Sequence, residues 1–312
     1  MQIFAFQYQN NELYKTYVNS IGVNPASVDT IEKIPFLPIS FFKTHTVKTT
    51  DFEPEIIFES SGTTGANTSR HYIKSSALYK RSFLKTFNLF YGNPFQWSIL
   101  AILPGYLERE NSSLVYMANE LIKISNNPAS GFYLHNHDSL YKALLRNEIV
   151  EKPTLLIGVT FALLDFAEKY SMKLQNTFVM ETGGMKGKRE EITREEVHQQ
   201  LKQKFGLSAI HSEYGMTELL SQAYSKGNGK FHCPPWMKVL VREYNDPFAI
   251  ISSGLSSKPA SGLINVIDLA NLYSCSFIGT DDVGRLYKDN SFEVLGRRDM
   301  SDLRGCSLLI DS

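Results

Sequence analysis

The sequence has few cysteines and no excess of charge of either sign. Cys233, Cys275 and Cys306 are spread over 312 residues without a C-x-x-C pair. This usage fits a reducing compartment such as the cytoplasm better than a disulfide or zinc framework. Thirty-two basic residues balance 32 acidic ones, and no basic run occurs. The charge pattern therefore argues against nucleic acid or an anionic membrane as the main partner.

Long apolar runs are also missing. The amino terminus lacks a basic region followed by an apolar segment, and the longest apolar-rich stretch, 154–167, is interrupted by Gly158 and Asp165. We therefore expect a cytoplasmic protein with neither a signal peptide nor a membrane span. With 43% hydrophobic residues, the chain can bury one large domain, or a large domain with a small appendage.

Several familiar site motifs are absent. The chain has no G-x-x-x-x-G-K-[ST] P-loop, no G-x-G-x-x-G dinucleotide fingerprint and no G-x-S-x-G nucleophile elbow. His135 and His137 stand close together with Asp138 beside them, but no further ligand at a spacing typical of metal sites accompanies them. We interpret them as loop or strand-end residues rather than as a metal site.

Apolar and amphipathic segments alternate along the middle of the chain. Segments 97–105, 153–159 and 177–184 predict strands, whereas 75–92 and 192–206 predict helices. This alternation predicts an α/β fold.

The two ends of the chain differ from this middle part. Segment 6–22 predicts a helix, and four closely spaced strand candidates (238–244, 248–252, 262–269 and 274–287) predict a β-rich subdomain. We therefore expect an entry segment (1–50) packed on the main domain, an α/β core (51–237), and a β-rich subdomain with a short tail (238–312).

The stretch FESSGTTGANTSR, residues 58–70, combines four hydroxyl side chains and two glycines within 60–65. EIIFE before it predicts a strand, and the expected order is strand, glycine-hydroxyl loop, helix. Glycines let successive backbone N–H groups point toward anionic oxygens, and hydroxyls add donors. The loop is thus a candidate phosphate cradle, although taken alone it is explained equally well as a polar surface turn.

Further segments favour the cradle. SSGTTG is followed in order by ETGGMKG, SEYGMTEL, IGTDDVGRL and EVLGRRDMSDLRG, a series that resembles the acyl-adenylate-forming (ANL) superfamily. Through IPFLPISFFKT and TGGMKGK the chain looks most like the acyl-protein synthetases (LuxE-like) of bacterial luciferase operons. The resemblance implies a large domain like the N-terminal domain of adenylate-forming enzymes, with sheets flanked by helices. Because the sequence stops at Ser312, we expect the mobile C-terminal domain of those ligases to be absent.

The resemblance also implies a site for ATP and Mg²⁺. The residues that it assigns to the triphosphate are Ser60, Ser61, Gly62, Thr63, Thr64 and Gly65. It assigns the adenine to Gly183, Gly184 and Tyr214, with Gly215 beside it, and the ribose to Asp282. Thr217 is assigned to the α-phosphate and Glu218 to Mg²⁺, and Arg297 is also among the ATP-binding residues.

Two positions near this site depart from the family pattern, and one role stays unassigned. Asp281 replaces a glycine, which leaves open whether one or both carboxylates face the ribose. Arg70 is a candidate for the charge that a Pro-Lys pair supplies in longer relatives. Which basic residue replaces the lysine of the missing domain stays open.

Cys306 stands where the acyl-protein synthetases carry an acceptor cysteine. A thiolate attacks the mixed anhydride of an acyl-adenylate, and AMP is a good leaving group. The resemblance therefore implies ATP-dependent activation of a carboxylic acid, a fatty one, followed by transfer to Cys306 and then to a protein partner such as an acyl reductase or carrier. We interpret Cys233 and Cys275 as structural.

Two alternatives stay open. The enzyme would otherwise deliver an aryl or biosynthetic acid to coenzyme A or a carrier protein, in which case Cys306 is dispensable. In the second alternative, the protein is a nucleotide-binding scaffold subunit without catalysis, and changing Glu218 leaves its function intact.

Overall fold

The computed structural model describes residues 1–60, 68–104, 110–184, 192–251 and 258–298. Contacts group the chain into two compact units, the first made of residues 1–51 and 235–312 and the second of residues 52–234. The expected entry segment and the expected β-rich subdomain thus fall in one unit, and the α/β segment forms the other.

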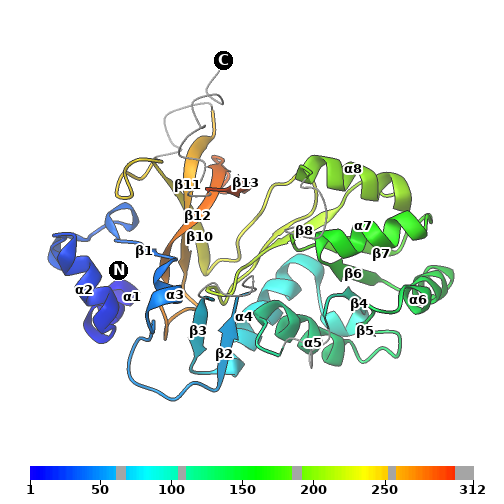
Figure 1. The fold of residues 1–312 in the computed structure, drawn as a ribbon, viewed down its shortest axis with the longest axis horizontal. Coiled ribbons are helices and arrows are strands. Elements are labelled where there is room, and N and C mark those ends of the chain that lie inside the picture. The colour runs from blue at the N-terminus through cyan, green and yellow to red at the C-terminus, as the bar shows by residue number, and fades with distance from the viewer. Residues whose placement is uncertain (61–67, 105–109, 185–191, 252–257, 299–312) are drawn as a thin grey trace. The chain divides into compact units, whose positions relative to one another are not determined.

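The second unit is built on a six-stranded sheet (Figure 1). The first five strands of the sheet run parallel and the last returns antiparallel. Strands β4 and β6 are buried along their whole length, as parallel strands covered on both faces are. In spatial order the strands are β5 (Gly131–Phe132), β4 (Ser98–Ile102), β6 (Thr154–Gly158), β7 (Thr177–Glu181), β8 (His211–Tyr214) and β9 (Ala223–Ser225).

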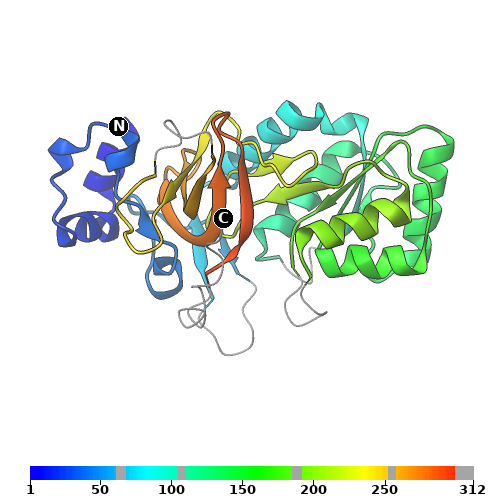
Figure 2. The same cartoon turned by 90° about the horizontal axis from the view of Figure 1, so that it is seen from above.

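Helices cover both faces of this sheet (Figures 1 and 2). Helices α4 (Ser76–Tyr91) and α5 (Ser113–Ser125) lie on one face, and α7 (Thr160–Lys169) and α8 (Arg194–Phe205) on the other. Helix α6 (His137–Ile149) packs into the same apolar core as α7 and α8. The short turn η3 (Pro94–Gln96) precedes β4. The predicted α/β fold is confirmed.

A separate antiparallel hairpin, β2 (Ile56–Glu59) with β3 (Arg70–Ile73), carries the glycine-hydroxyl loop. The strand and the helix predicted on either side of the loop are present as β2 and α4, but a second strand, β3, which was not predicted from the sequence, precedes α4. The reason lies in 70–73, where exposed or half-buried residues alternate with buried ones, which is the two-residue period of a strand. The loop therefore lies, in sequence order, between two paired strands.

The first unit contains a mainly antiparallel sheet of β10 (Met237–Arg242), β11 (Ala260–Asp268), β12 (Phe277–Leu286) and β13 (Phe292–Arg297). Strand β1 (Leu37–Pro38) adds parallel to β12, with Leu37 opposite Ile278. The β-rich part is confirmed. Of the predicted strand 248–252, the described residues contribute only an isolated bridge between Ile250 and Arg242.

The predicted helix over 6–22 is instead two helices, α1 (Gln2–Asn10) and α2 (Glu12–Ser20). Asn11 separates them, because its side-chain oxygen accepts the Tyr14 backbone N–H at 2.9 Å and so caps α2. Gln7 donates to the Asn271 carbonyl at 2.9 Å, which joins α1 to the turn before β12. The connection to β1 contains η1 (Pro25–Ser27) and η2 (Ile31–Lys33), and α3 (Phe41–Thr44) follows β1.

Among the described residues, no helix is both long enough and apolar enough to span a membrane.

Candidate active site

Two of the predicted motifs leave the parallel sheet side by side. The T-G-G segment follows Glu181 at the end of β7, and the Y-G-M-T-E segment begins with Tyr214 at the end of β8. The two strands are neighbours, with Glu181 opposite Ser212. Carboxyl ends of parallel strands are where open α/β sheets bind their ligands. The fold therefore brings these two sets of predicted site residues together.

The glycine pair has a backbone conformation that suits glycine. Gly183 has φ +75° and Gly184 has φ +93°, in the left-handed region that residues with a side chain rarely adopt. The Thr160 N–H donates to the Gly183 carbonyl at 2.9 Å, and the Thr182 hydroxyl donates to the Gly158 carbonyl at 3.3 Å. Among the described residues, no atom lies within 4 Å of the place where a Gly183 Cβ would stand. These bonds hold the backbone there, and the described residues leave the place of a Gly183 side chain open.

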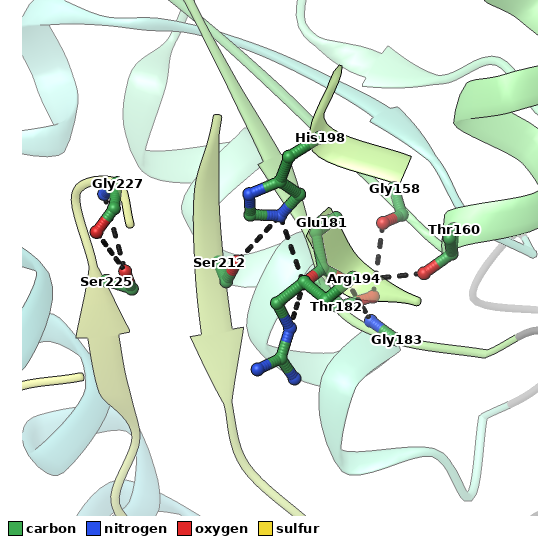
Figure 3. A network of polar contacts seen from close by, with 10 residues as sticks. All are labelled: Gly158, Thr160, Glu181, Thr182, Gly183, Arg194, His198, Ser212, Ser225 and Gly227. Carbon is green, nitrogen blue, oxygen red and sulfur yellow. Dashed lines mark hydrogen bonds and ion pairs between the residues drawn. The ribbon is translucent and has the colours of Figure 1, made fainter. Parts of the chain in front are cut away.

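A buried carboxylate, Glu181, holds this segment (Figure 3). Its Oε2 accepts the Gly183 N–H at 2.8 Å and the Thr160 hydroxyl at 3.2 Å. Its Oε1 lies 3.2 Å from Arg194 Nε and 3.6 Å from His198 Nε2. Burial alone would raise the pKa of Glu181, but the His198 hydrogen bond, the Arg194 charge and the Gly183 amide outweigh it and lower the pKa to about 2. Glu181 is therefore ionised at neutral pH.

A second carboxyl group beside the motif behaves in the opposite way. Burial, followed by the charge of Glu181, raises the pKa of Glu213 to about 8. A Cβ on Gly215 would stand 2.3 Å from Glu213 Oε1, so a glycine at 215 leaves room for this carboxyl group. Tyr214 is 7% exposed. The two glutamates thus carry different charges at pH 7 in one small region.

The residues predicted at the phosphates are tied to the hairpin. His71 on β3 is fully buried, and its Nδ1 lies 2.7 Å from the Thr217 carbonyl. Because a carbonyl only accepts, Nδ1 carries the proton. Glu218 is 5% exposed, in a turn where the Leu219 N–H donates to the Met216 carbonyl at 3.1 Å.

The carboxylate of Glu218 fits the Mg²⁺ prediction by its chemistry. Mg²⁺ is usually bound by one or two carboxylates together with substrate phosphates and water, and it does not require a cage of side chains. Within the described ranges, no group of three or more His, Cys, Asp or Glu residues could hold a metal ion. His137 and Asp138 open α6 after the cap residue Asn136, so their interpretation as loop or strand-end residues is wrong.

The base of the glycine-hydroxyl loop is closed by two serines. The Ser69 N–H donates to Ser60 Oγ at 2.9 Å, and the Ser60 N–H donates to the Ser69 carbonyl at 3.1 Å. Next to them, Arg70 Nε lies 3.2 Å from Glu59 Oε1, so the proposed phosphate cation already has a carboxylate neighbour. The remaining loop residues, Ser61, Gly62, Thr63, Thr64 and Gly65, lie outside the described residues, as does Cys306.

In the first unit, Asp282, predicted at the ribose, and Arg297, predicted among the ATP-binding residues, face each other across two strands. Asp282 on β12 is 5% exposed and lies opposite Arg297 on β13, whose Nε donates to Asp282 Oδ1 at 3.0 Å. Asp281 is exposed, because successive strand residues point to opposite faces. The two aspartate side chains therefore point to opposite faces of β12.

The two described cysteines differ in exposure. Cys275 is fully buried, its Sγ–H donates to the Phe277 carbonyl at 3.4 Å, and burial raises its pKa to about 12. This thiol is a poor nucleophile at neutral pH, since the thiolate is the reactive form, and its structural interpretation is supported. Cys233 is half-buried.

Sequence reasoning did not single out Glu181, Arg194, His198, Glu213 or His71. Glu181 and Glu213 stood inside the quoted motifs, directly before the T-G-G and Y-G-M-T-E segments. The partners of Glu181 on α8 lie 13 and 17 residues further along the chain, and nothing in their spacing marked them. Only the packing of α8 beside β7 and β8 identifies them.

Comparisons with known proteins give a consistent result. The family model for the acyl-protein synthetase LuxE matches residues 1–312. The long-chain-fatty-acid–luciferin-component ligase of Vibrio harveyi is 23% identical over 333 residues, covering 98% of this chain and 84% of the relative.

Solved structures of adenylate-forming enzymes share the fold. A 2-hydroxyisobutyryl-CoA ligase in complex with 2-HIB-AMP and CoA has a TM-score of 0.68 at 11% identity, over 95% of this chain and 72% of the other. ATP-bound MatB from Rhodopseudomonas palustris has a TM-score of 0.58 at 15% identity, over 80% of this chain. This chain spans half the length of MatB, 50% of that chain. At these identities the likeness shows the fold alone.

Proposed function

The chain belongs to the LuxE family of acyl-protein synthetases, ATP-dependent ligases that form acyl-adenylates, and from this premise we propose that it activates a long-chain fatty acid and transfers the acyl group to a protein thiol. The name of the Vibrio harveyi relative supports the fatty acid as substrate. The observation that carries the proposal is the side-by-side exit of the glycine pair and the Tyr214–Glu218 segment from β7 and β8.

In the first step, a carboxylate oxygen of the acid attacks the α-phosphorus of ATP. A P–O bond to the α-phosphate forms, the bond to the bridging oxygen breaks, and pyrophosphate leaves. The acid needs no base, because carboxylic acids are already ionised near pH 7. The work of the protein is thus positioning and charge neutralisation.

We assign the roles in this step as follows. The glycine pair and Tyr214 hold the adenine, Asp282 and Arg297 bind the ribose, the 60–65 loop binds the triphosphate, and Thr217 binds the α-phosphate. Glu218 would hold Mg²⁺, which would supply neutralisation of the phosphate charge. The carboxylate of Glu218 is held in a buried turn, which suits this task.

In the second step, the Cys306 thiolate attacks the acyl carbonyl carbon. A thioester bond forms, the bond between the acyl carbon and the phosphate oxygen breaks, and AMP leaves. A partner protein such as an acyl reductase or carrier then takes the acyl group. Support for Cys306 comes from its place in the family pattern and from the burial of Cys275, which withdraws that thiol from such chemistry.

The test follows pyrophosphate exchange and protein-bound label together. Wild type, Cys306→Ser and the control Cys233→Ser are incubated with ATP, Mg²⁺ and radiolabelled fatty acids. We expect exchange in all three proteins, and label on denatured wild type and Cys233→Ser but not on Cys306→Ser. Exchange without protein label favours an external acceptor such as coenzyme A. Absence of exchange with every acid favours the scaffold alternative and contradicts the proposal.

A further inference from the structure

The carboxylate of Glu181 contacts Gly183 directly and contacts Tyr214 through intervening side chains. Gly183 and Tyr214 are the residues predicted on the two sides of the adenine. We propose that Glu181 is a positioning residue for ATP, which fixes the glycine pair on one side and the aromatic wall around Tyr214 on the other. This inference rests on the proposed function, because it concerns the same nucleotide site.

One arm of the network reaches the glycine pair. Oε2 of Glu181 accepts both the Gly183 N–H and the Thr160 hydroxyl, while the Thr160 N–H holds the Gly183 carbonyl. The peptide groups on either side of Gly183 are therefore anchored to one carboxylate and one threonine. A left-handed glycine is the most adaptable backbone position in a loop, so these bonds select one of its many conformations.

The other arm reaches the aromatic wall. Arg194, whose Nε contacts Oε1 of Glu181, places its guanidinium 5.2 Å from the ring centroid of Phe231. The Phe231 ring lies 5.9 Å from the Tyr214 ring. A guanidinium over an aromatic face is attractive, and planar Arg is suited to contact a carboxylate and a ring together. Arg194 thus connects Glu181 to the ring that supports Tyr214.

A third contact fixes the strand that carries Tyr214. His198 Nε2 lies 3.6 Å from Glu181 Oε1 and 3.3 Å from Ser212 Oγ (Figure 3). Ser212 stands two residues before Tyr214 on the same face of β8, because side chains alternate along a strand. Both proposed walls of the pocket are therefore linked through these contacts to the same carboxylate, that of Glu181.

The charge of Glu181 matters for this task. The carboxylate is 4% exposed and stays ionised because of His198, Arg194 and the Gly183 amide. Hydrogen bonds to an ionised acceptor are shorter and stronger than those to a neutral one. An isosteric amide keeps the volume and one acceptor oxygen, but loses the attraction to Arg194, so it tests charge separately from packing.

The experiment measures ATP binding by titration calorimetry and, separately, ATP–pyrophosphate exchange with a fatty acid. The variants are Glu181→Gln and Arg194→Ala, with Glu195→Gln as the control. Glu195 directly follows Arg194 on α8, and its side chain is exposed. We expect Glu181→Gln to weaken ATP binding and to raise KM for ATP about tenfold, with KM for the acid unchanged. Arg194→Ala shows a smaller effect in the same direction, and Glu195→Gln stays within twofold of wild type.

The outcomes separate this inference from the proposed function. Glu181→Gln with wild-type ATP affinity overturns the inference, as does an equal change in KM for ATP and acid, which indicates a structural role only. If Glu181→Gln does not fold, Arg194→Ala decides by the same two criteria. Wild type without ATP binding also overturns the inference. Wild type that binds ATP but shows no exchange with any acid contradicts only the proposed function.

Discussion

In the second unit the residues predicted at the adenine and the α-phosphate stand at or beyond the ends of parallel strands, whereas in the first unit the predicted nucleotide-binding residues lie within antiparallel strands. Gly183 and Tyr214–Glu218 stand at or beyond the carboxyl ends of β7 and β8. Asp282 and Arg297 are strand residues of β12 and β13 and lie opposite each other in the register. The position of a loop residue depends on the hydrogen bonds around it. The direction of a side chain on a strand follows instead from the alternation of side chains between the two faces of the sheet.

The two arrangements hold their charged groups differently. Glu181 is buried among two backbone or hydroxyl donors and two basic side chains. Asp282 is also buried, but its partner Arg297 has a side chain that is 63% exposed, where an ion pair contributes little to stability. We infer that the glycine pair and Tyr214, proposed at the adenine, are held in place before ATP binds. Arg297, in contrast, can exchange Asp282 for a ligand.

The largest expected effect separates catalysis from binding. Glu218→Gln removes the carboxylate proposed for Mg²⁺, and we expect the rate of ATP–pyrophosphate exchange to fall by about 100-fold or more. The rate is measured at saturating ATP, so that weaker binding does not contribute. A variant that exchanges at the rate of wild type contradicts the assigned role of Glu218.

The next largest effect is expected at Asp282, because side chains alternate between the two faces of β12. Asp282→Asn would weaken the contact that we propose with the ribose, and we expect KM for ATP to rise about tenfold, as loss of a charged hydrogen bond does. Asp281→Asn, on the opposite face of the strand, serves as the matched control and stays within twofold of wild type. Equal effects at both positions are incompatible with a strand that presents only one carboxylate to the nucleotide.

A smaller effect is expected at the link between the hairpin and Thr217. His71→Leu leaves the Thr217 carbonyl without its His71 donor, and we expect the free energy of unfolding to fall by about 1–3 kcal/mol, with a severalfold rise in KM for ATP. Urea unfolding and exchange kinetics measure the two quantities. The control His232→Leu changes an exposed imidazole and leaves both near wild type. An unchanged KM would show that the link serves stability alone.

The smallest effect on activity, and a distinct effect on stability, is expected from Glu213→Gln. The pKa of Glu213 is raised to about 8, so its contribution to stability is complete below its unfolded pKa near 4.5 and is lost as pH rises through about 8. The variant lacks this loss, and its stability relative to wild type increases with pH.

The pH window for this test avoids a neighbouring group. Burial, followed by Lys226, lowers the pKa of His211 to about 4, so its contribution is complete above pH 6.5 and is lost as pH falls through about 4. Between pH 6.5 and 9 the difference between wild type and Glu213→Gln therefore reports Glu213. Parallel stability curves over this window contradict the raised pKa.

Much of the fold was predictable because it depends on local patterns. The apolar runs at 97–105 and 153–159 become β4 and β6, because burial on both faces leaves a continuous apolar run. The amphipathic 192–206 becomes α8, because burial on one face leaves a periodic pattern. Where two signals compete, the prediction failed. Asn11 acts as a helix cap inside a helical pattern, and 70–73 is a strand too short to stand out beside the helix that follows.

The candidate site was predictable only where the residues themselves carry a motif. The resemblance identified Gly183, Gly184 and Tyr214, and the sheet places these motifs at neighbouring strand ends. It did not identify the contacts that hold them. Arg194 and His198 meet Glu181 only through the packing of α8, which depends on tertiary structure and not on spacing in the sequence.

The most direct test of the central claim looks for the acyl-adenylate itself. Cys306→Ser is mixed with α-labelled ATP, Mg²⁺ and a long-chain fatty acid, quenched in acid, and the labelled products are separated by chromatography. The account predicts that acyl-adenylate accumulates to about one per protein molecule, because the thiol that would consume it has been removed. Unchanged ATP with no labelled adenylate, in a variant that is folded and binds ATP, would contradict the account.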